Sequence, residues 1–212
     1  MRSYGQFCAV AKALDVIGDR WTLLIVRELL LAGPSRYTDL RSGLPGIATN
    51  LLADRLRQLE AAGLLAREEA PPPVASTLFS LTPRGEQLRG VLDALGAWGV
   101  EYMAEGPAPG DAFRGRWLAW PVERFLRDSQ PDGQPVSLEL QTGEAPLLVE
   151  AGGGEITARP GPGTEPDVVL SGEPYPILGL LSGRIGLAEA RRRGVRLQGD
   201  AAVLARLAPA AA

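Results

Sequence analysis

Residues 49–63 read TNLLADRLRQLEAAG, and this stretch decides the fold of the first half of the chain. At about 100° per residue, one side of a helix collects four leucines: Leu51, Leu52, Leu56 and Leu59. The opposite side collects a second set near the N-terminal end: Asn50, Ala53, Asp54 and Arg57. This pattern predicts a helix that is capped by Thr49, runs to Ala62 and stops at Gly63, with the leucines facing a core.

The sequence around this helix predicts the order of its neighbours. Three helices are expected before it, over residues 7–17, over residues 20–31 with Asp19 as cap, and over a short stretch after Thr38. Two short strands are expected after it, at 64–68 and 77–81, joined by a loop that contains the prolines 71–73. Thr82-Pro83 then opens a last helix, which covers residues 84–103. Four helices, a hairpin and a helix form the order of a winged helix-turn-helix.

In such a fold the N-terminal part of the second motif helix meets base edges in the major groove. Asn50 then suits adenine, Arg57 suits guanine or phosphate, and Thr49 suits a phosphate at the helix start. Asp54 departs from this pattern, and either accepts from cytosine N4 or holds Arg57 in place. An ordinary amphipathic surface helix is the alternative, and the hairpin favours the winged helix. The candidate DNA-binding residues are Arg36, Thr38, Thr49, Asn50, Ala53, Asp54, Arg57, Arg67, Ser76 and Thr77.

Several separated blocks resemble the HxlR-type winged-helix transcriptional regulators. They are YGQFCAVAKALD at 4–15, GDRWTLLI at 18–25, YTDL at 37–40, LPGI at 44–47, LRQLEAAGL at 56–64 and LTPRG at 81–85. The resemblance covers residues 4–102 and departs from many members at Ala9, where they have Pro. It implies a homodimer, joined by its terminal helices, on a pseudo-palindromic operator in double-stranded DNA. The candidate dimer residues are Phe7, Leu88, Val91, Leu92, Leu95 and Trp98.

Cys8 is the single cysteine and lies near the start of the first helix. In some regulators of the resembling family a cysteine here is a redox switch. A reactive thiol needs exposure and a lowered pKa, which a helix N-terminus favours. The alternative is a small packed residue.

Residues 106–110 (GPAPG) have the composition of a linker, so the sequence predicts two domains, 1–105 and 111–212. The second is expected to be α+β. A helix rich in aromatic residues comes first, strands are expected at 136–140, 146–150, 155–158 and 168–170, and helices at 175–181, 187–193 and 201–207. The stretches VVLSG at 168–172, SGR at 182–184 and GVRLQGD at 194–200 resemble the sterol-carrier-protein-like fold, which implies a site for a hydrophobic small molecule. The candidate ligand-binding residues are Phe113, Trp117, Trp120, Phe125, Leu178 and Leu181.

Composition limits the function. The chain has 212 residues, no His, a net charge of −3 and 45% hydrophobic residues. Up to Gly106 it carries 11 basic against 12 acidic residues, so no strongly basic domain stands out. Without His, a catalytic triad and a Cys/His metal cluster are excluded, so we expect no enzyme, cofactor or metal. No membrane span or signal peptide is predicted, and we expect a cytoplasmic protein.

The leading interpretation is therefore a DNA-binding transcriptional repressor that is controlled by a hydrophobic or aromatic small-molecule effector. Redox control through Cys8 is the first alternative. A lipid or small-molecule carrier without a regulatory role is the second.

Overall fold

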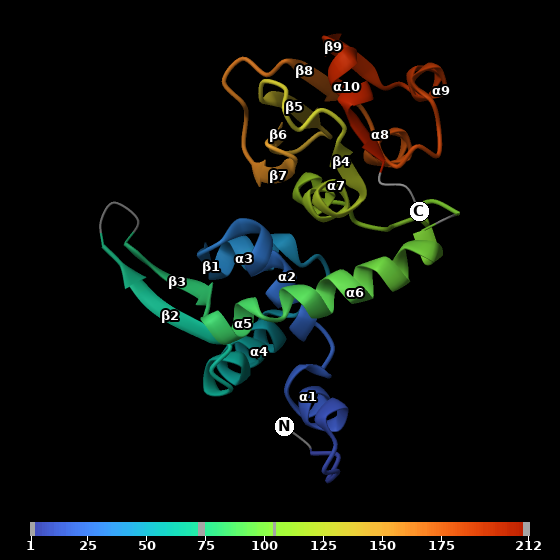
Figure 1. Cartoon of the computed structure of the whole chain (residues 1–212). Coiled ribbons are helices and arrows are strands. Elements are labelled where there is room, and N and C mark those ends of the chain that lie inside the picture. Colours follow the sequence, from blue (N-terminus) through green and yellow to red (C-terminus); the bar gives the residue numbers. More distant parts are fainter. Residues whose placement is uncertain (1–2, 72–74, 104, 210–212) are drawn as a thin grey trace. The chain divides into compact units, whose positions relative to one another are not determined.

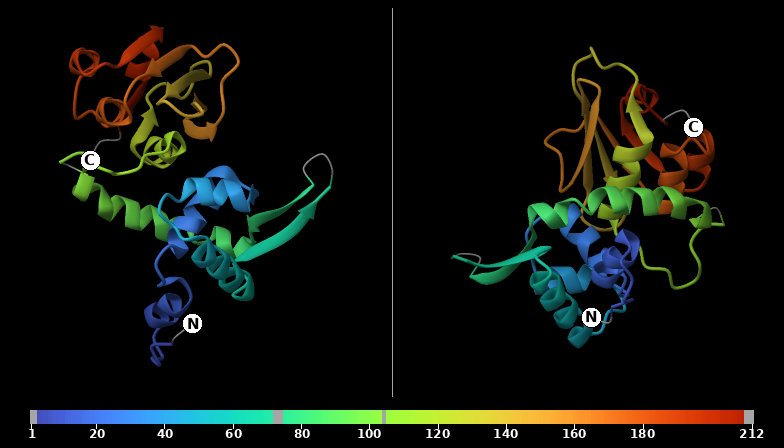
Figure 2. Two further views of the ribbon diagram at one scale, coloured as in Figure 1. Left: turned by 180° about the vertical axis from the view of Figure 1, so that it is seen from behind. Right: turned by 60° about the horizontal axis from the view of Figure 1, so that its bottom comes forward.

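The computed structural model describes residues 3–71, 75–103 and 105–209. The chain divides into two compact units, Met1–Val100 and Glu101–Ala212. Figure 1 labels their elements and Figure 2 shows the same ribbon from two further sides. The prolines 72 and 73 of the expected hairpin loop lie outside the described residues.

The first unit is a winged helix-turn-helix. Its elements are α1 (Ala9–Ile17), α2 (Thr22–Ala32), β1 (Ser35–Arg36), α3 (Tyr37–Gly43), α4 (Thr49–Ala61), β2 (Leu65–Ala70), β3 (Ser76–Leu81), α5 (Pro83–Glu86) and α6 (Arg89–Gly99). The strands form one antiparallel sheet in the order β1-β3-β2. Both views in Figure 2 show the β2–β3 hairpin projecting from the body of this unit, as a wing does.

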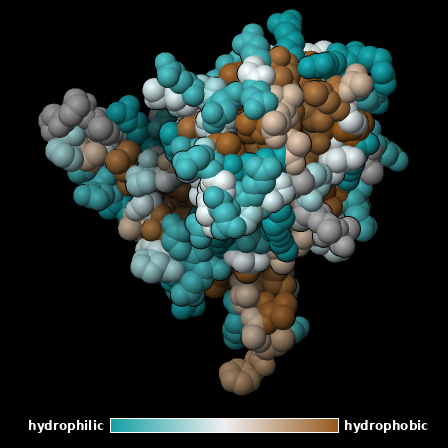
Figure 3. Space-filling view, turned by 45° about the horizontal axis from the view of Figure 1, so that its top comes forward, coloured by the Kyte–Doolittle hydropathy of each residue, from teal (hydrophilic) through white to brown (hydrophobic). Residues whose placement is uncertain are grey.

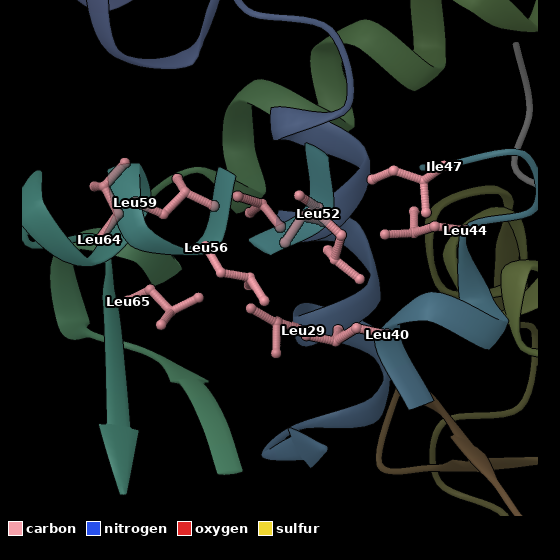
Figure 4. Packing of buried hydrophobic residues seen from close by; sticks show 11 residues of the cluster. Leu29, Leu40, Leu44, Ile47, Leu52, Leu56, Leu59, Leu64 and Leu65 are labelled. Carbon is pink, nitrogen blue, oxygen red and sulfur yellow. The ribbon is translucent and has the colours of Figure 1, made fainter. Parts of the chain in front are cut away.

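The core of this unit gathers leucines and isoleucines from α2, α3, α4 and β2 (Figure 4). Ile25, Leu40 and Leu52 are at most 1% exposed. Leu44 and Ile47, on the segment between α3 and α4, are buried in the same cluster. This packing sets the rotation of α4 about its own axis, because three of its leucines point into the cluster.

Several local expectations are corrected. The N-cap of α2 is Trp21, with φ 78° and no side-chain cap, so Asp19 does not cap this helix. The N-cap residues of α3 and α4 are Arg36 and Ala48 rather than Thr38 and Thr49, which lie inside the helices. The Asp39 carboxylate accepts from the backbone N–H of Arg36 at 3.1 Å and closes the first turn of α3.

The last helix of the first half is broken in two. Thr82 caps α5 as expected, and its Oγ1 accepts from the Gly85 N–H at 3.1 Å. The expected single helix over 84–103 instead consists of α5, α6 and the 3-10 turn η1 (Val100–Met103). The two-residue strand β1 was not expected, and it pairs with β3 through Ser35 and Phe79.

The second unit is α+β. Its elements are η2 (Gly115–Leu118), α7 (Ala119–Phe125), β4 (Leu126–Asp128), β5 (Val136–Gln141), β6 (Leu147–Gly152), β7 (Glu155–Pro160), β8 (Val168–Ser171), α8 (Pro174–Leu181), α9 (Leu187–Arg192), β9 (Arg196–Gly199), α10 (Ala202–Arg206) and β10 (Leu207–Pro209). Five strands form a sheet in the order β7-β6-β5-β8-β9, in which only the β5–β8 pair is parallel. Strands β4, β9 and β10 were not expected.

Residues 106–110 are tied down locally within the second unit. The Gly106 N–H donates to the Met103 carbonyl at 3.1 Å, and the Ala108 N–H donates to the Asp111 carboxylate at 2.8 Å. Gly106 has φ +85°, and a Cβ there would lie 3.3 Å from the Tyr175 ring on α8. This glycine therefore allows a close approach between the segment and α8.

Candidate nucleic-acid interface

The leucine stripe of α4 is buried, which fixes the opposite stripe outward. Leu52, Leu56 and Leu59 are 0%, 3% and 2% exposed. Asn50, Asp54 and Arg57 lie on the outer side and are exposed. Ala53, which the sequence grouped with them, is half-buried at the flank of this stripe. We call Asn50, Asp54 and Arg57 the outer stripe of α4.

Two residues of the outer stripe form an ion pair. An Arg57 Nη2 hydrogen is donated to Asp54 Oδ1, and the two side chains remain 75% and 51% exposed. The Arg57 Nε–H lies 3.4 Å from the Ala53 carbonyl oxygen. Of the two roles left open for Asp54, the structure therefore shows the contact with Arg57.

The other two polar residues near the start of α4 make local contacts. Asn50 Oδ1 accepts from the Leu51 N–H at 3.0 Å. The Thr49 side chain is exposed, and its carbonyl accepts from the Tyr37 hydroxyl at 2.7 Å. This last bond ties the start of α4 to the start of α3, the two helices of the motif.

An anchor that sequence reasoning missed holds the far side of α4. Arg55 Nη1 donates to Asp19 Oδ2 at 2.5 Å and also to the Gln58 side chain. Asp19 thus links the segment before α2 to α4 instead of capping α2. The available signal was that Arg55 falls between the leucines and the outer stripe, where a charged side chain needs a partner from another element.

The wing contributes the remaining candidates. Arg67 on β2 is exposed, and Ser76 and Thr77 on β3 are half-buried. The Thr77 hydroxyl donates to Glu69 Oε1 at 2.6 Å across the hairpin. Arg36 lies opposite Leu78 of β3 at the base of the wing. Thr38 is exposed on the first turn of α3. The candidates therefore come from four elements of one unit: β1, α3, α4 and the wing.

A second exposed surface of this unit is apolar. Phe7 is 106% exposed, and the α1 side chains Val10 and Leu14 are 67% and 43% exposed. Figure 3 shows apolar side chains on the projecting region where α1 lies. On α6, Val91, Leu95 and Trp98 are 39%, 44% and 67% exposed. We call these six residues the terminal-helix surface.

Two of the expected dimer residues pack inside the first unit. Leu88 and Leu92 are half-buried and pack against the core cluster of the first unit. Substitution of either residue would therefore perturb the fold as well as any interface.

The N-terminal arm is held in shape by Asp15. Its carboxylate accepts from the Ser3 hydroxyl at 2.8 Å and from the Tyr4 N–H at 2.7 Å. These bonds lower the pKa of Asp15. Cys8, between this arm and α1, is the N-cap residue and is exposed. The backbone N–H groups of Ala11 and Val10, at the start of α1, lower the pKa of its thiol.

The candidate ligand site of the second unit is only partly assembled. A hollow of about 10 Å³ lies between α7 and α8. It is lined by Pro121, Val122, Phe125, Leu126, Leu178, Leu181 and Ser182. Three of the six expected residues therefore meet there. Phe113 and Trp117 pack on each other instead at 6.1 Å between ring centroids, and Trp120 packs edge-on against Phe125 at 5.3 Å.

The second unit also contains a buried ion pair. Arg206 Nε and Nη2 donate to the two oxygens of Asp128 at 2.7 and 2.9 Å, and both side chains are almost completely buried. The Arg206 guanidinium holds the pKa of Asp128 down at about 2. This pair joins α10 to β4, and β10, which directly follows α10, pairs with β4.

Among the residues that the structure describes, no group of three or more Cys, Asp or Glu side chains is placed to hold a metal ion. Within the same residues, no helix combines the length and apolar character needed to cross a membrane.

Comparisons with known proteins agree with this architecture. Residues 16–107 match the family model described as HxlR-like helix-turn-helix. A helix-turn-helix transcriptional regulator of Synechocystis is 34% identical over 101 residues, which cover 48% of this chain and 74% of that protein. The reduced form of the Bacillus subtilis regulator YodB is 28% identical, covers 48% of this chain and 100% of its own, and has a TM-score of 0.41.

A relative in Mycobacterium tuberculosis extends the similarity. This helix-turn-helix transcriptional regulator is 31% identical over 164 residues, which cover 73% of this chain and 87% of that protein. Because that alignment is longer than the first unit, it reaches into the second unit.

Proposed function

Since the chain belongs to the HxlR-like helix-turn-helix family and is a transcriptional regulator of that type, we propose that it binds a pseudo-palindromic operator as a homodimer. The observation that carries this proposal is the outer stripe of α4. Its polar residues face outward because three leucines behind them are buried. The N-terminal half of such a helix fits the major groove, and the wing supplies contacts beside it.

The experiment is binding of the full-length chain to a pool of random duplex DNA, followed by sequencing of the bound fraction. We expect enrichment of a two-fold related sequence with half-sites about one helical turn apart. Enrichment of a single, unrepeated half-site would contradict the dimer. No enrichment at all would contradict operator binding.

The terminal-helix surface supports the homodimer. Its six apolar side chains are exposed on α1, on α6 and just before α1. Helix α1 fully buries only Ala11, and only Val16 and Ile17 at its end pack against the core cluster. A nine-residue helix with so little packing is marginal on its own, so a partner surface is needed to stabilise it. A second copy offers the same apolar surface in return, as two-fold symmetry requires.

We further propose that the second unit responds to a hydrophobic small molecule and that the protein is a repressor released by it. The hollow between α7 and α8 supports this because its lining is apolar, and α8 itself is apolar around most of its circumference. At about 10 Å³ the hollow has room for about one water molecule, so α8 would have to move to admit a ligand. A sterol-carrier-protein-like fold for this unit is part of the same proposal.

A comparison of residues 1–105 with the whole chain tests this proposal. A Bacillus subtilis relative aligns over 92 residues that make up 84% of its length, so a domain like the first unit forms nearly a whole protein there. Both proteins should bind the operator, and only the whole chain should change its affinity with added hydrophobic compounds. An equal response of the short protein would place the sensing site in the first unit.

Redox control through Cys8 is the second candidate function. The observation that favours it is the exposed thiol with its lowered pKa at the start of α1. Oxidation there would alter the terminal-helix surface next to Phe7. Release of DNA by an oxidant from the wild type, but not from Cys8→Ser, would make this the leading mechanism.

A further inference from the structure

A carboxylate occupies the middle of the outer stripe of α4, where a DNA-binding helix usually carries neutral or cationic residues. Asp54 is 51% exposed there and receives a hydrogen bond from Arg57. A lone carboxylate at this place repels phosphates, whereas an ion pair presents a fixed pattern of donors and acceptors. The pair is therefore best considered as one recognition unit.

The pair offers its hydrogen bonds in a definite order. Of the five N–H groups of Arg57, one on Nη2 reaches Asp54 Oδ1 and the Nε–H faces the Ala53 carbonyl. Three N–H groups remain, two on Nη1 and one on Nη2, and one from each Nη forms the end of the guanidinium fork. Beside them, Asp54 Oδ2 remains as an acceptor. The exposed edge of the pair thus reads donor, donor, acceptor.

One base pair presents the complementary order in the major groove. Guanine offers N7 and O6 as acceptors, and its partner cytosine offers the N4 amino group as a donor next to them. An inverted C·G pair reverses this order, and an A·T pair places a donor between two acceptors. We propose that Asp54 and Arg57 together read one G·C pair in one orientation in each half-site.

In this arrangement Arg57 donates to guanine N7 and O6, and Asp54 accepts from cytosine N4. This inference rests on the proposed operator binding, and it identifies the base pair that α4 would select.

The same pair weakens binding to other sequences. At any other base pair the amino donor does not lie opposite Asp54, and Asp54 still neutralises the charge that Arg57 would otherwise bring to a phosphate. Removal of the carboxylate frees Arg57 for a phosphate contact, and each such contact adds about one to the salt dependence of binding. Asp54 therefore determines specificity in two ways. It lowers the affinity for wrong sequences, and it accepts a hydrogen bond from cytosine N4 in the right one.

The test uses the full-length chain and the operator that it selects from random duplex DNA. Arg57→Ala first identifies the position where base preference depends on this side chain. The wild type should prefer G·C there over C·G and A·T by about 5- to 150-fold, the range of a good bidentate contact. Asp54→Ala should lose most of that preference, while its affinity for non-specific DNA and its salt dependence both rise.

Two further variants separate the pairing from simple loss of charge. Asp54→Asn keeps the shape but replaces one acceptor by a donor, so it should also lose the preference for G·C. Glu60→Gln removes another exposed carboxylate of α4 that lies off the outer stripe, and it should keep the full preference. Circular dichroism and thermal unfolding confirm that each variant folds.

Retention of the full G·C preference by Asp54→Ala would overturn the proposal, and so would an Arg57-dependent position that is not G·C. In both of these outcomes operator binding itself stands. A wild-type chain that enriches no sequence would instead contradict operator binding.

Discussion

Replacement of Phe7 by Ala tests the assembly of the protein without touching the fold of one chain. Phe7 precedes α1 and is fully exposed, so it contributes nothing to the packing of an isolated copy. The arm that carries it is held by the Asp15 carboxylate through Ser3 and Tyr4, and the substitution leaves those bonds in place. Any effect of Phe7→Ala must therefore arise from a surface outside the chain.

The magnitude follows from the burial of this side chain in a dimer. Complete burial of a phenylalanine side chain contributes about 1.5–3 kcal/mol. A two-fold interface buries two copies, so the substitution should weaken dimerisation by about 3–6 kcal/mol. This corresponds to an increase in the dimer Kd of about 10²- to 10⁴-fold.

Sedimentation over a wide concentration range measures this Kd. Phe79→Ala is the matched control. It removes the same side chain, but Phe79 lies on β3 and packs against the core cluster instead of facing outward. It should lower thermal stability and leave the dimer Kd of the folded protein within a few-fold of wild type. Phe7→Ala protein should also need a higher concentration to fill the two half-sites of the operator.

A dimer Kd for Phe7→Ala equal to that of wild type would refute this reasoning, since it would leave a fully exposed phenylalanine outside the interface. A wild-type protein that sediments as one chain at all concentrations would refute the dimer as a whole.

Three further results are expected. Arg57→Ala and Asn50→Ala should each weaken operator binding by about 1–3 kcal/mol in fluorescence anisotropy with unchanged melting, and unaltered affinity in both would mean that α4 is wrongly oriented. Because Arg206 lowers the pKa of Asp128 to about 2 from 3.8, the pair stabilises the second unit above pH 4. That stability should be lost as the pH falls toward 2 in tryptophan fluorescence, and an acid transition unchanged in Asp128→Asn would exclude this cause. Cys8→Ser should bind the operator as tightly as wild type in reductant, measured by gel shift. Weaker binding would mean that the thiol is needed for the structure of the segment before α1.

The rotation of α4 could be predicted from the sequence because its signal is local. Leucines at positions 52, 56 and 59 repeat with the helical period, and their burial alone decides which side faces out. Ala53 shows the limit of this method, since it falls at the edge of the stripe and its exposure depends on neighbouring elements.

Contacts between distant segments could not be predicted in the same way. Arg55 and Asp19 are 36 residues apart, and nothing in the local pattern selects this partner for Asp19 over the nearer α2 N-terminus. The break between α5 and α6 also depends on packing, because Leu88 and Leu92 turn toward the core while Leu95 and Trp98 remain exposed. A single apolar stripe in the sequence does not separate these two environments.

The aromatic residues of the second unit show a different limit. The sequence left both a ligand pocket and an ordinary core open for Trp117 and Trp120, and in the structure each side chain packs edge-on against a phenylalanine. Aromatic pairs of this kind are stabilising by themselves, so a cluster of rings in a sequence does not distinguish a filled core from a ligand site.

The charge distribution limits how a protein with a net charge of −3 would recognise DNA. Up to Gly106 acidic residues slightly outnumber basic ones, so general attraction to the phosphate backbone is weak. On the proposed interface itself, Asp54 pairs with Arg57, and Glu69 on the wing bonds Thr77.

In the proposed complex the free energy of binding must then come mainly from base contacts, which the two-fold symmetry of a homodimer would double. Linking two weak half-site contacts in one particle raises affinity without adding charge. It also keeps affinity for random DNA low, because random DNA rarely offers both half-sites at the right spacing. A shallow dependence of operator affinity on salt follows directly, and a steep dependence would show that unpaired arginines, rather than the outer stripe of α4, provide most of the binding.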